Sequence, residues 1–215
     1  MKLNETLENL RVSYQASSLD IGDCHQDPFE QFNKWFDESV KSMCDEPNAF
    51  VLSTIKENKP RSRVVLLKGI IDKAFLFYTN YESAKGLEIE NNPYASMNFL
   101  WLPLQRQVRI EGVLSKVSEQ QSNQYFQKRP RGSQLGAIAS PQSKKVSSRQ
   151  ELEGMFHQTE RKYEGIESVP RPSHWGGYAL TPHYIEFWQG RSNRLHDRIC
   201  FQKVNNQWEL YRLAP

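Results

Sequence analysis

The stretch AFVLSTIKENKPRSRVVLLKGIIDKAFLFYT, residues 49–79, decides the fold. It contains three apolar runs rich in β-branched and aromatic residues, at 49–55, 63–68 and 74–79, and these runs predict strands. Residues 57–60 are typical of a turn, and connections this short join antiparallel rather than parallel strands. The stretch therefore predicts an antiparallel meander.

The same signals continue along the chain. Further strands are predicted at 94–101, 107–117, 177–180, 184–189, 198–204 and 207–213, with a hairpin turn at Asn205-Asn206. Helices are predicted from Pro28 to about Cys44, at 82–91, from Ser118 to about Lys128 and from Ser148 to about Tyr163. There is no repeating β-α-β rhythm, so the predicted fold class is mainly β: an antiparallel, Greek-key-like barrel with peripheral helices.

The domain organisation is predicted to be simple. Residues 1–27 are polar and weakly patterned, although the spacing of their leucines indicates a short helix. We predict that residues 1–27 form a mobile N-terminal segment. Residues 28–215 contain no linker long enough to separate domains, so they are predicted to form a single domain.

Composition limits the functional classes. The chain has 28 basic and 25 acidic residues, a net charge of +3, which excludes a strongly basic nucleic-acid coat and a strongly acidic disordered chain. No apolar run approaches the ~18 residues of a membrane span, and the polar start is unlike a secretory signal. Three widely spaced cysteines fit neither a disulfide framework nor a zinc site, so the expected compartment is the cytoplasm.

Several common catalytic motifs are missing from the sequence. It contains no GxGxxG, GxxxxGK[ST], HExxH or GxSxG. The five histidines never fall at metal-ligand spacing, so no metal site is predicted.

Residues 128–149 contain basic side chains and no acidic one. The basic residues are Lys128, Arg129, Arg131, Lys144, Lys145 and Arg149. Arg and Lys neutralise phosphate, while the interleaved Ser hydroxyls and loop amides can satisfy its remaining acceptor oxygens. The alternatives are a solvated basic loop and a nucleic-acid-binding patch.

Two shorter groups also suit an anion. Arg63 and Lys68 flank an apolar run that is expected to be a buried strand, so these cations need anionic partners or reach solvent along their own stems. Residues 78–80, Tyr-Thr-Asn, lead into a helix start with Ser83 and Lys85. A hydroxyl and a cation at a helix start suit an anion, or they simply cap the helix.

The strongest group follows Trp188. Arg194, His196 and Arg198 alternate at period two, so in an extended segment they would project from one face. Three cationic or titratable groups on one face beside a tryptophan predict a pocket for a planar anion.

Taken together, these segments resemble the pyridoxamine 5′-phosphate oxidases, a family of FMN enzymes. The resemblance extends from about Leu10 to Pro215. Its motifs are, in order, RVVLLK (63–68), FYTN (77–80), ENNP (90–93), RQV (106–108), QYFQKRPRGSQLGA (124–137), FWQG (187–190), RLHDR (194–198) and RLAP (212–215). Eight motifs in this order, with compatible spacing, make the resemblance specific.

The resemblance implies a split β-barrel that acts as a homodimer with FMN between the subunits. The implied FMN contacts are Arg63, Val64, Val65, Leu66, Leu67, Lys68, Tyr78, Thr79, Lys85, Gln107, Gln142, Ser143, Trp188 and Arg198. The implied substrate contacts are Lys68, Tyr125, Arg129, Ser133, Arg194, Leu195, His196, Arg11 and Tyr14. Arg194 and His196 are the implied catalytic pair beside the substrate ring, and residues 1–27 are the implied active-site lid.

The implied reaction converts pyridoxamine 5′-phosphate and pyridoxine 5′-phosphate to pyridoxal 5′-phosphate, in vitamin B6 biosynthesis and salvage. A hydride leaves C4′ of the substrate for flavin N5, and the imine formed from the amine is hydrolysed with release of ammonia. Molecular oxygen reoxidises the flavin and becomes hydrogen peroxide. The flavin carries the redox step, so the protein has mainly to orient and to tune charge. Neither a nucleic acid nor a membrane is an implied partner.

The chain departs from the family pattern at two places. Ala84 stands where a basic residue is common before Lys85, and Val12-Ser13 stand where charged residues are usual. Three other functions stay open: an FMN oxidase of another substrate, as in phenazine biosynthesis, a flavin- or pyridoxal-phosphate-binding carrier or sensor, and a nucleic-acid module.

Overall fold

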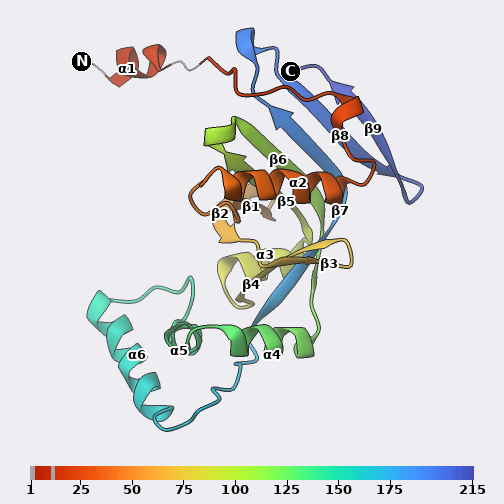
Figure 1. Cartoon of the computed structure of the whole chain (residues 1–215). Helices are drawn as coiled ribbons and strands as arrows, with labels where there is room; N and C mark the ends of the chain where they lie inside the picture. Colours follow the sequence, from red (N-terminus) through yellow and green to blue (C-terminus); the bar gives the residue numbers. More distant parts are fainter. Residues whose placement is uncertain (1–2, 11–12) are drawn as a thin grey trace. The chain divides into compact units, whose positions relative to one another are not determined.

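The computed structural model describes residues 3–10 and 13–215 (Figure 1). Its strands are β1 Ala49–Lys56, β2 Lys59–Leu66, β3 Gly69–Ile71, β4 Ala74–Asn80, β5 Tyr94–Trp101, β6 Arg106–Lys116, β7 Trp175–Gln189, β8 Asp197–Val204 and β9 Gln207–Leu213. Its α-helices are α1 Leu3–Asn9, α2 Pro28–Lys41, α3 Ala84–Asn91, α4 Glu119–Lys128, α5 Arg131–Ala139 and α6 Arg149–Lys162. The pairings of β4 with β3 and β7, and of β8 with β7 and β9, are antiparallel, which confirms the predicted fold class.

Three hairpins turn on two residues each. The turn residues are Glu57-Asn58, Asp72-Lys73 and Asn205-Asn206, all with φ between 48° and 65°. Turns with two positive φ angles match the right-handed twist of the strands that they join. The predicted turn at Asn205-Asn206 is confirmed. The turn predicted at 57–60 is shorter than expected, because Lys59 and Pro60 already belong to β2.

Hydrogen bonds join the strands in the order β2-β1-β5-β6-β7-β4-β3, and β8 pairs with both β7 and β9. The chain divides into two compact units. Unit 1 comprises residues 1–50, 97–111 and 183–215, and unit 2 comprises 51–96 and 112–182. Each unit combines segments that are distant in sequence. Whether residues 28–215 act as one domain stays a prediction.

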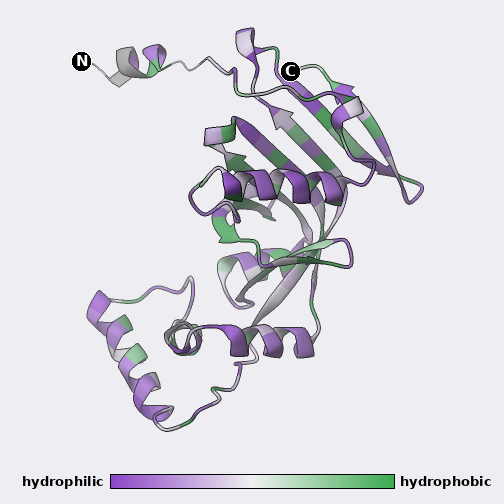
Figure 2. Cartoon of the chain, in the orientation of Figure 1, coloured by the Kyte–Doolittle hydropathy of each residue, from purple (hydrophilic) through white to green (hydrophobic). Residues whose placement is uncertain are grey.

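Helix α2 supplies much of the core of unit 1. Asp27 caps the helix, as predicted. Most of α2 is coloured as hydrophilic in Figure 2, so only a narrow apolar side of the helix packs into the core of unit 1. Phe32 and Trp35, at most 2% exposed, place their ring centroids 5.2 Å from Phe99 and Phe187 respectively. These edge-on aromatic contacts stabilise the unit beyond simple burial of area.

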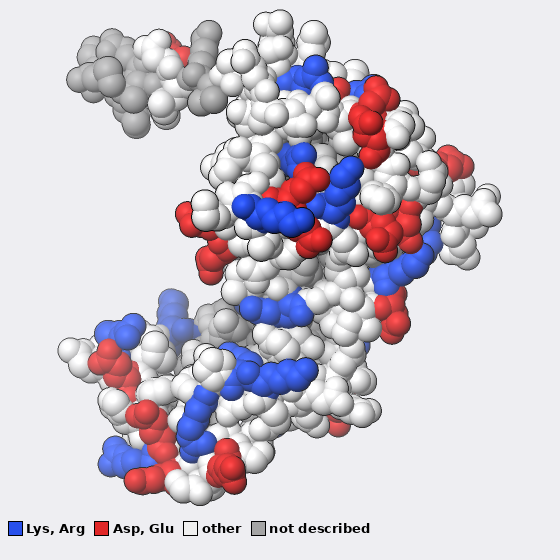
Figure 3. All heavy atoms as spheres, in the orientation of Figure 1, with Lys and Arg blue, Asp and Glu red and all other residues white. Residues whose placement is uncertain are grey.

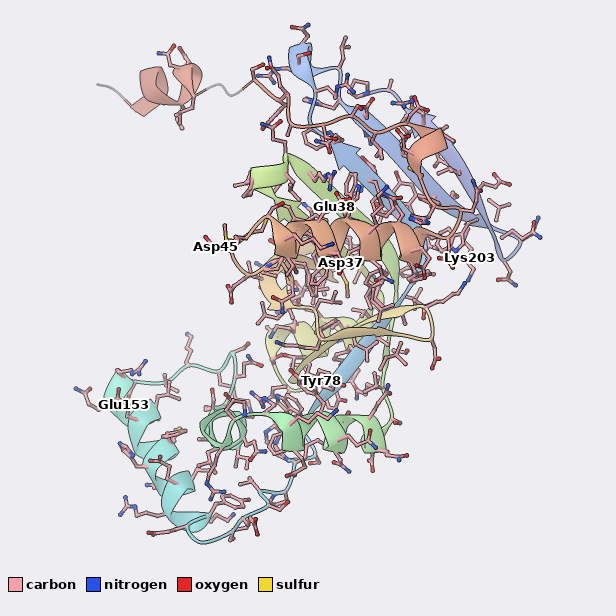
Figure 4. All side chains as sticks on the ribbon, in the orientation of Figure 1. Asp37, Glu38, Asp45, Tyr78, Glu153 and Lys203 are labelled. Atoms are coloured by element: carbon pink, nitrogen blue, oxygen red, sulfur yellow. The ribbon has the colours of Figure 1, made fainter. Side chains whose placement is uncertain are left out.

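In unit 2, β4 pairs with the first half of β7, and Tyr78 lies opposite Gly177. A Cβ atom on Gly177 would lie 2.7 Å from the Tyr78 ring, so glycine is what lets this ring lie against the strand. Beside it, Phe126, Leu135, Val169 and Trp175 form a buried cluster below α4 and α5. Tyr78, labelled in Figure 4, belongs to β4 and stacks on Tyr125 of α4.

Two sequence predictions are wrong in detail. The basic stretch 128–149 is not a loop throughout, because residues 131–139 form helix α5. Its two glycines and its serine lower helix propensity, but Leu135 is 4% exposed against the unit 2 cluster, and this packing outweighs propensity. The strands predicted at 177–180 and 184–189 are one continuous strand, β7.

The run 63–68 is also not the buried strand that was predicted. Strand β2 ends at Leu66, and it lies at one end of the strand order, with β1 as its only neighbour there. Val64 is 67% exposed, and Val65 and Leu66 are half-buried. An apolar composition reveals a strand but does not reveal whether that strand is at an edge.

No helix among the residues described is long and apolar enough to cross a membrane. The three cysteines are free thiols, and all three are buried.

Candidate functional site

Arg63, on β2, is held by a buried acid of unit 2. Its Nη2 lies 2.5 Å from Oε2 of Glu88, which is 6% exposed, and its Nη1 donates to the Thr54 hydroxyl. The same hydroxyl donates to Glu88 at 2.5 Å. Burial alone would raise the pKa of Glu88, but the hydrogen bonds from Thr54 and Arg63 and the Arg63 charge outweigh burial and lower it. Glu88 therefore fixes one end of the Arg63 guanidinium.

Lys85 provides a second cation near Arg63. Ser83 caps α3 by accepting the N–H of Gly86 at 3.3 Å, and Lys85 lies in the first turn. Its Nζ lies 3.2 Å from Oγ1 of Thr79 and 3.4 Å from Oγ of Ser83. Burial first, and then the Arg63 charge, lowers the pKa of Lys85. Two cations beside two hydroxyls form a donor set that fits a phosphate group.

Of the other predicted FMN contacts of unit 2, Thr79 and Gln142 are linked to Lys85 by hydrogen bonds. The Thr79 hydroxyl donates to Oε1 of Gln142 at 3.4 Å. Ser143 follows in an exposed turn with φ 70°. Leu67 is buried, whereas Lys68 is exposed and its backbone N–H donates to Leu76.

An aromatic stack joins predicted FMN and substrate contacts within unit 2. The rings of Tyr78 and Tyr125 are stacked with centroids 3.8 Å apart, and both are close to parallel with Trp175. Arg129 ends helix α4, and its guanidinium lies 4.6 Å from the centroid of the Trp175 ring. Ser133 lies exposed in the first turn of α5. Figure 3 shows Lys and Arg side chains over the α4–α5 region.

Three rings of unit 1 form the second predicted group. The His196 centroid lies 4.5 Å from that of Trp188, and Tyr14 meets both rings edge-on at 5.7 and 5.9 Å. The backbone N–H of Arg191 donates to Nδ1 of His196 at 3.1 Å, so the neutral ring carries its proton on Nε2. Sequence reasoning thus placed Trp188 and His196 together correctly.

The prediction that Arg194, His196 and Arg198 project from one face of an extended segment is wrong. Residues 192–194 form a 3-10 turn, and Asn193 and Arg194 have φ of 55° and 61°. Only Arg198 belongs to β8, while Arg194 and Leu195 are exposed on the turn. Asparagine tolerates the left-handed region, so the Ser-Asn pair before Arg194 was the available signal for a turn.

Arg198 is held by a buried acid, as Arg63 is. Its guanidinium makes two bonds to Glu186, of 2.8 and 3.0 Å, and Glu186 is 3% exposed. Arg109 lies 2.9 Å from the same carboxylate, and the Tyr184 hydroxyl donates to it at 2.9 Å. Burial would raise the pKa of Glu186, but these donors outweigh it and lower it. Gln107, also in unit 1, accepts a 3.4 Å hydrogen bond from Asn98.

The described part of the N-terminal segment is hydrogen-bonded to the rest of unit 1 through Gln105, Asp197 and Arg212. Oε1 of Gln105 accepts the N–H groups of Gln15 and Ala16 at 2.9 and 3.1 Å. Oδ2 of Asp197 accepts the N–H of Leu19 at 3.0 Å. These bonds hold Tyr14 beside His196. Arg11, the other predicted lid residue, lies outside the described residues.

Four residues that contact or position predicted site residues were not predicted from the sequence: Glu88, Glu186, Gln105 and Trp175. Each acts by holding a predicted site residue. The available signals were weak, since an isolated Glu in a helix or strand is usually solvated. Glu186 had the better signal, because it interrupts an apolar strand at Ile185 and Phe187.

His196 gives a pH prediction. Burial, and then the Arg194 charge, lowers its pKa from the ordinary 6.5, and Asp197 only partly opposes them. Protonation of His196 would break the hydrogen bond from Arg191. The contribution of neutral His196 to the free energy of unfolding is therefore complete above the pKa that the residue has in the unfolded chain. It is lost as the pH falls through the lower folded pKa. We expect NMR titration of the His196 ring to give a midpoint below 6.5, and Arg194→Ala to raise it. A midpoint above 6.5 in the unmodified chain would contradict this environment.

The comparisons with known proteins agree with this geometry. A family model described as pyridoxamine 5′-phosphate oxidase matches residues 36–163, and one described as the pyridoxine 5′-phosphate oxidase C-terminal dimerisation region matches 175–215. The fold is similar to that of a pyridoxamine 5′-phosphate oxidase-related, FMN-binding protein from Nostoc punctiforme, with a TM-score of 0.71, 17% identity and coverage of 89% of this chain and 100% of that one. The chain thus has the split-barrel fold that was predicted.

Relatives along the full length define the family. Pyridoxine/pyridoxamine 5′-phosphate oxidases from Leptospira interrogans and Salinibacter ruber are 52% and 48% identical, and the matches cover 99% and 97% of this chain and 100% and 99% of theirs. The structure of PhzG from Burkholderia lata, in complex with tetrahydrophenazine-1-carboxylic acid, has a TM-score of 0.88, 27% identity and coverage of 95% and 100%. The chain belongs to the pyridoxamine 5′-phosphate oxidase family.

Proposed function

We propose that this chain is an FMN-dependent oxidase that converts pyridoxamine 5′-phosphate and pyridoxine 5′-phosphate to pyridoxal 5′-phosphate. Molecular oxygen is the acceptor, hydrogen peroxide is formed, and the amine also yields ammonia. The observation that carries the proposal is the stack of Tyr78, assigned to FMN, on Tyr125, assigned to substrate, at 3.8 Å. Arg129 lies close enough to Tyr125 to act on it, and Arg63 and Lys85 form a separate cationic pair, so unit 2 offers two places for two phosphates.

FMN, when bound, supplies the oxidation itself by accepting a hydride from the substrate. The residues of unit 2 bind the two phosphates: Arg63 and Lys85 bind that of FMN, and Arg129, Tyr125, Ser133 and Lys68 bind that of the substrate. Each charge-assisted hydrogen bond contributes about 1.5–3 kcal/mol, so three or four hold a small ligand tightly.

We propose that His196, Arg194 and Tyr14 orient the reacting end of the substrate. His196, neutral with a proton on Nε2, donates to the polar substituent of the substrate ring, and Arg194 fixes the ring over the flavin. Tyr14 excludes water from the same side. We propose a homodimer with FMN between the subunits, which the matched dimerisation region supports. We propose the cytoplasm as its compartment.

An oxygen-uptake assay with pyridoxamine 5′-phosphate tests the function. We expect the purified protein to be yellow, to consume oxygen, and to form pyridoxal 5′-phosphate and hydrogen peroxide in equal amounts. Addition of FMN to stripped protein restores the rate. A colourless protein that FMN cannot reconstitute would exclude the proposal, and a flavin-bound protein without turnover would indicate a carrier or sensor.

A second substrate class is supported by the similarity to PhzG. That protein binds a carboxylic acid, and a half-buried arginine such as Arg129 attracts a carboxylate as well as a phosphate. Steady-state turnover on both substrate types separates the two functions. We expect the phosphate ester to be the better substrate, because Arg129, Tyr125 and Ser133 offer more donors than a carboxylate uses.

A further inference from the structure

Arg129 has an unusual partner for a half-buried cation. Its guanidinium lies over the Trp175 ring, 4.6 Å from the centroid, and 5.8 Å from the centroid of Phe126. Its Nη1 is buried and has no hydrogen-bond partner among residues 3–10 and 13–215. Burial lowers the pKa of Arg129. A half-buried guanidinium whose buried Nη1 has no partner is suited to an anion that would satisfy this donor.

The contrast with Arg63 shows what a ring partner provides. Glu88 takes one N–H of Nη2 of Arg63, so that N–H cannot also serve a ligand, and the remaining donors are left for one. An aromatic face attracts the charge of a guanidinium. It does not use up the N–H groups at the edge of the guanidinium plane, which can still donate to a ligand. Trp175 therefore orients Arg129 while its donors stay available.

Trp175 is itself firmly placed. It is 5% exposed, and its backbone carbonyl accepts a hydrogen bond from Arg171. The Phe126 ring meets it edge-on at 5.2 Å. Its plane lies at 4° to that of Tyr125 with the centroids 6.3 Å apart, and the Tyr78 ring stacks on both, so Trp175 belongs to the stack that aligns Tyr125.

We propose that Trp175 is a positioning residue for phosphate recognition, which holds the Arg129 cation and the Tyr125 ring ready for the phosphate monoester of the substrate. This inference rests on the proposed function, because it deepens the role of the same site. It assigns Trp175 to specificity for phosphorylated over unphosphorylated substrates. It also explains why a large planar side chain stands here rather than a smaller apolar one.

Three full-length, FMN-loaded variants test the proposal: Trp175→Leu, Trp175→Phe and Val169→Ala. Val169 lies in the same buried cluster and is the matched control for lost packing. The probes are inorganic phosphate, by calorimetry, and pyridoxamine 5′-phosphate and unphosphorylated pyridoxamine, by oxygen uptake. Loss of a desolvated cation–π contact corresponds to roughly tenfold in affinity.

We expect Trp175→Leu to raise the Kd of phosphate and the KM of pyridoxamine 5′-phosphate about tenfold, with the KM of pyridoxamine unchanged. Trp175→Phe recovers most of the loss, because it keeps an aromatic face. Val169→Ala lowers Tm but leaves phosphate binding as in the unmodified chain.

Two results would overturn the proposal. One is an equal rise in KM for both substrates in Trp175→Leu, and the other is the same loss of phosphate affinity in Val169→Ala. Either would make Trp175 a packing residue only. If the unmodified chain shows no turnover, the proposed function fails, but the calorimetric comparison still decides the role of Trp175.

Discussion

Arg63→Ala is expected to purify without bound flavin. The substitution removes the guanidinium assigned to the FMN phosphate, and the loss of two charge-assisted hydrogen bonds corresponds to about 3 kcal/mol or more. The Kd of FMN, measured by quenching of flavin fluorescence, should rise by about 10²-fold or more. Lys85 alone cannot compensate, because its single ammonium group replaces neither the charge nor the two-pronged donor geometry of the Arg63 guanidinium.

The structure suggests the controls for this variant. Arg61, exposed on the same strand, carries the same charge, and Arg61→Ala should retain FMN. Arg63→Ala also leaves Glu88 buried without its cation, which destabilises the fold. Adding Glu88→Gln removes that charge, so the double variant should regain stability but not FMN. Flavin retention by the double variant would show that Arg63 does not bind the FMN phosphate.

Arg194→Ala is expected to give a yellow protein with little turnover. We expect kcat/KM for pyridoxamine 5′-phosphate to fall on the order of 10²-fold, because substrate orientation is lost while FMN stays bound. Arg194 lies at φ 61°, so a backbone effect must be separated from a side-chain effect. Arg194→Gly accepts that conformation without strain and should be equally inactive, whereas Asn193→Gly should stay active.

The two predicted phosphate sites can be distinguished by measuring, for each variant, both the flavin absorbance and the rate of turnover. Arg63→Ala should lose flavin and Arg194→Ala should keep it. If both variants lost flavin to the same extent, the division of the cationic residues into a cofactor group and a substrate group would be wrong.

Local signals in the sequence predicted much of the fold. Ser118 and Ser148 each accept the N–H group three residues later, as a capping box requires, and helices α4 and α6 begin where those caps predicted. The final hairpin, β8 and β9, was predicted from alternation and two asparagines. Such features depend on neighbours in the chain, so a sequence contains them directly.

What the sequence could not show depends on contacts between distant segments. Helix α5 forms because Leu135 reaches the cluster around Phe126, and nothing local indicates this. The edge position of β2 follows from the strand order rather than from its own apolar residues. Glu88 and Glu186 become partners of Arg63 and Arg198 only after the strands and helix α3 are assembled. The resemblance predicted a set of site residues, but it did not predict the residues that hold them in place.

The three two-residue turns have a practical consequence for engineering the protein. Glu57, Asp72 and Lys73 have φ angles of 52°, 49° and 58°, a conformation that costs a non-glycine residue about 1 kcal/mol. None of these positions belongs to the proposed site. Glycine at such turns relieves the strain, so heat resistance could be increased at several independent places without a change in chemistry. The tips of these hairpins are therefore the first places to alter in a longer-lived catalyst.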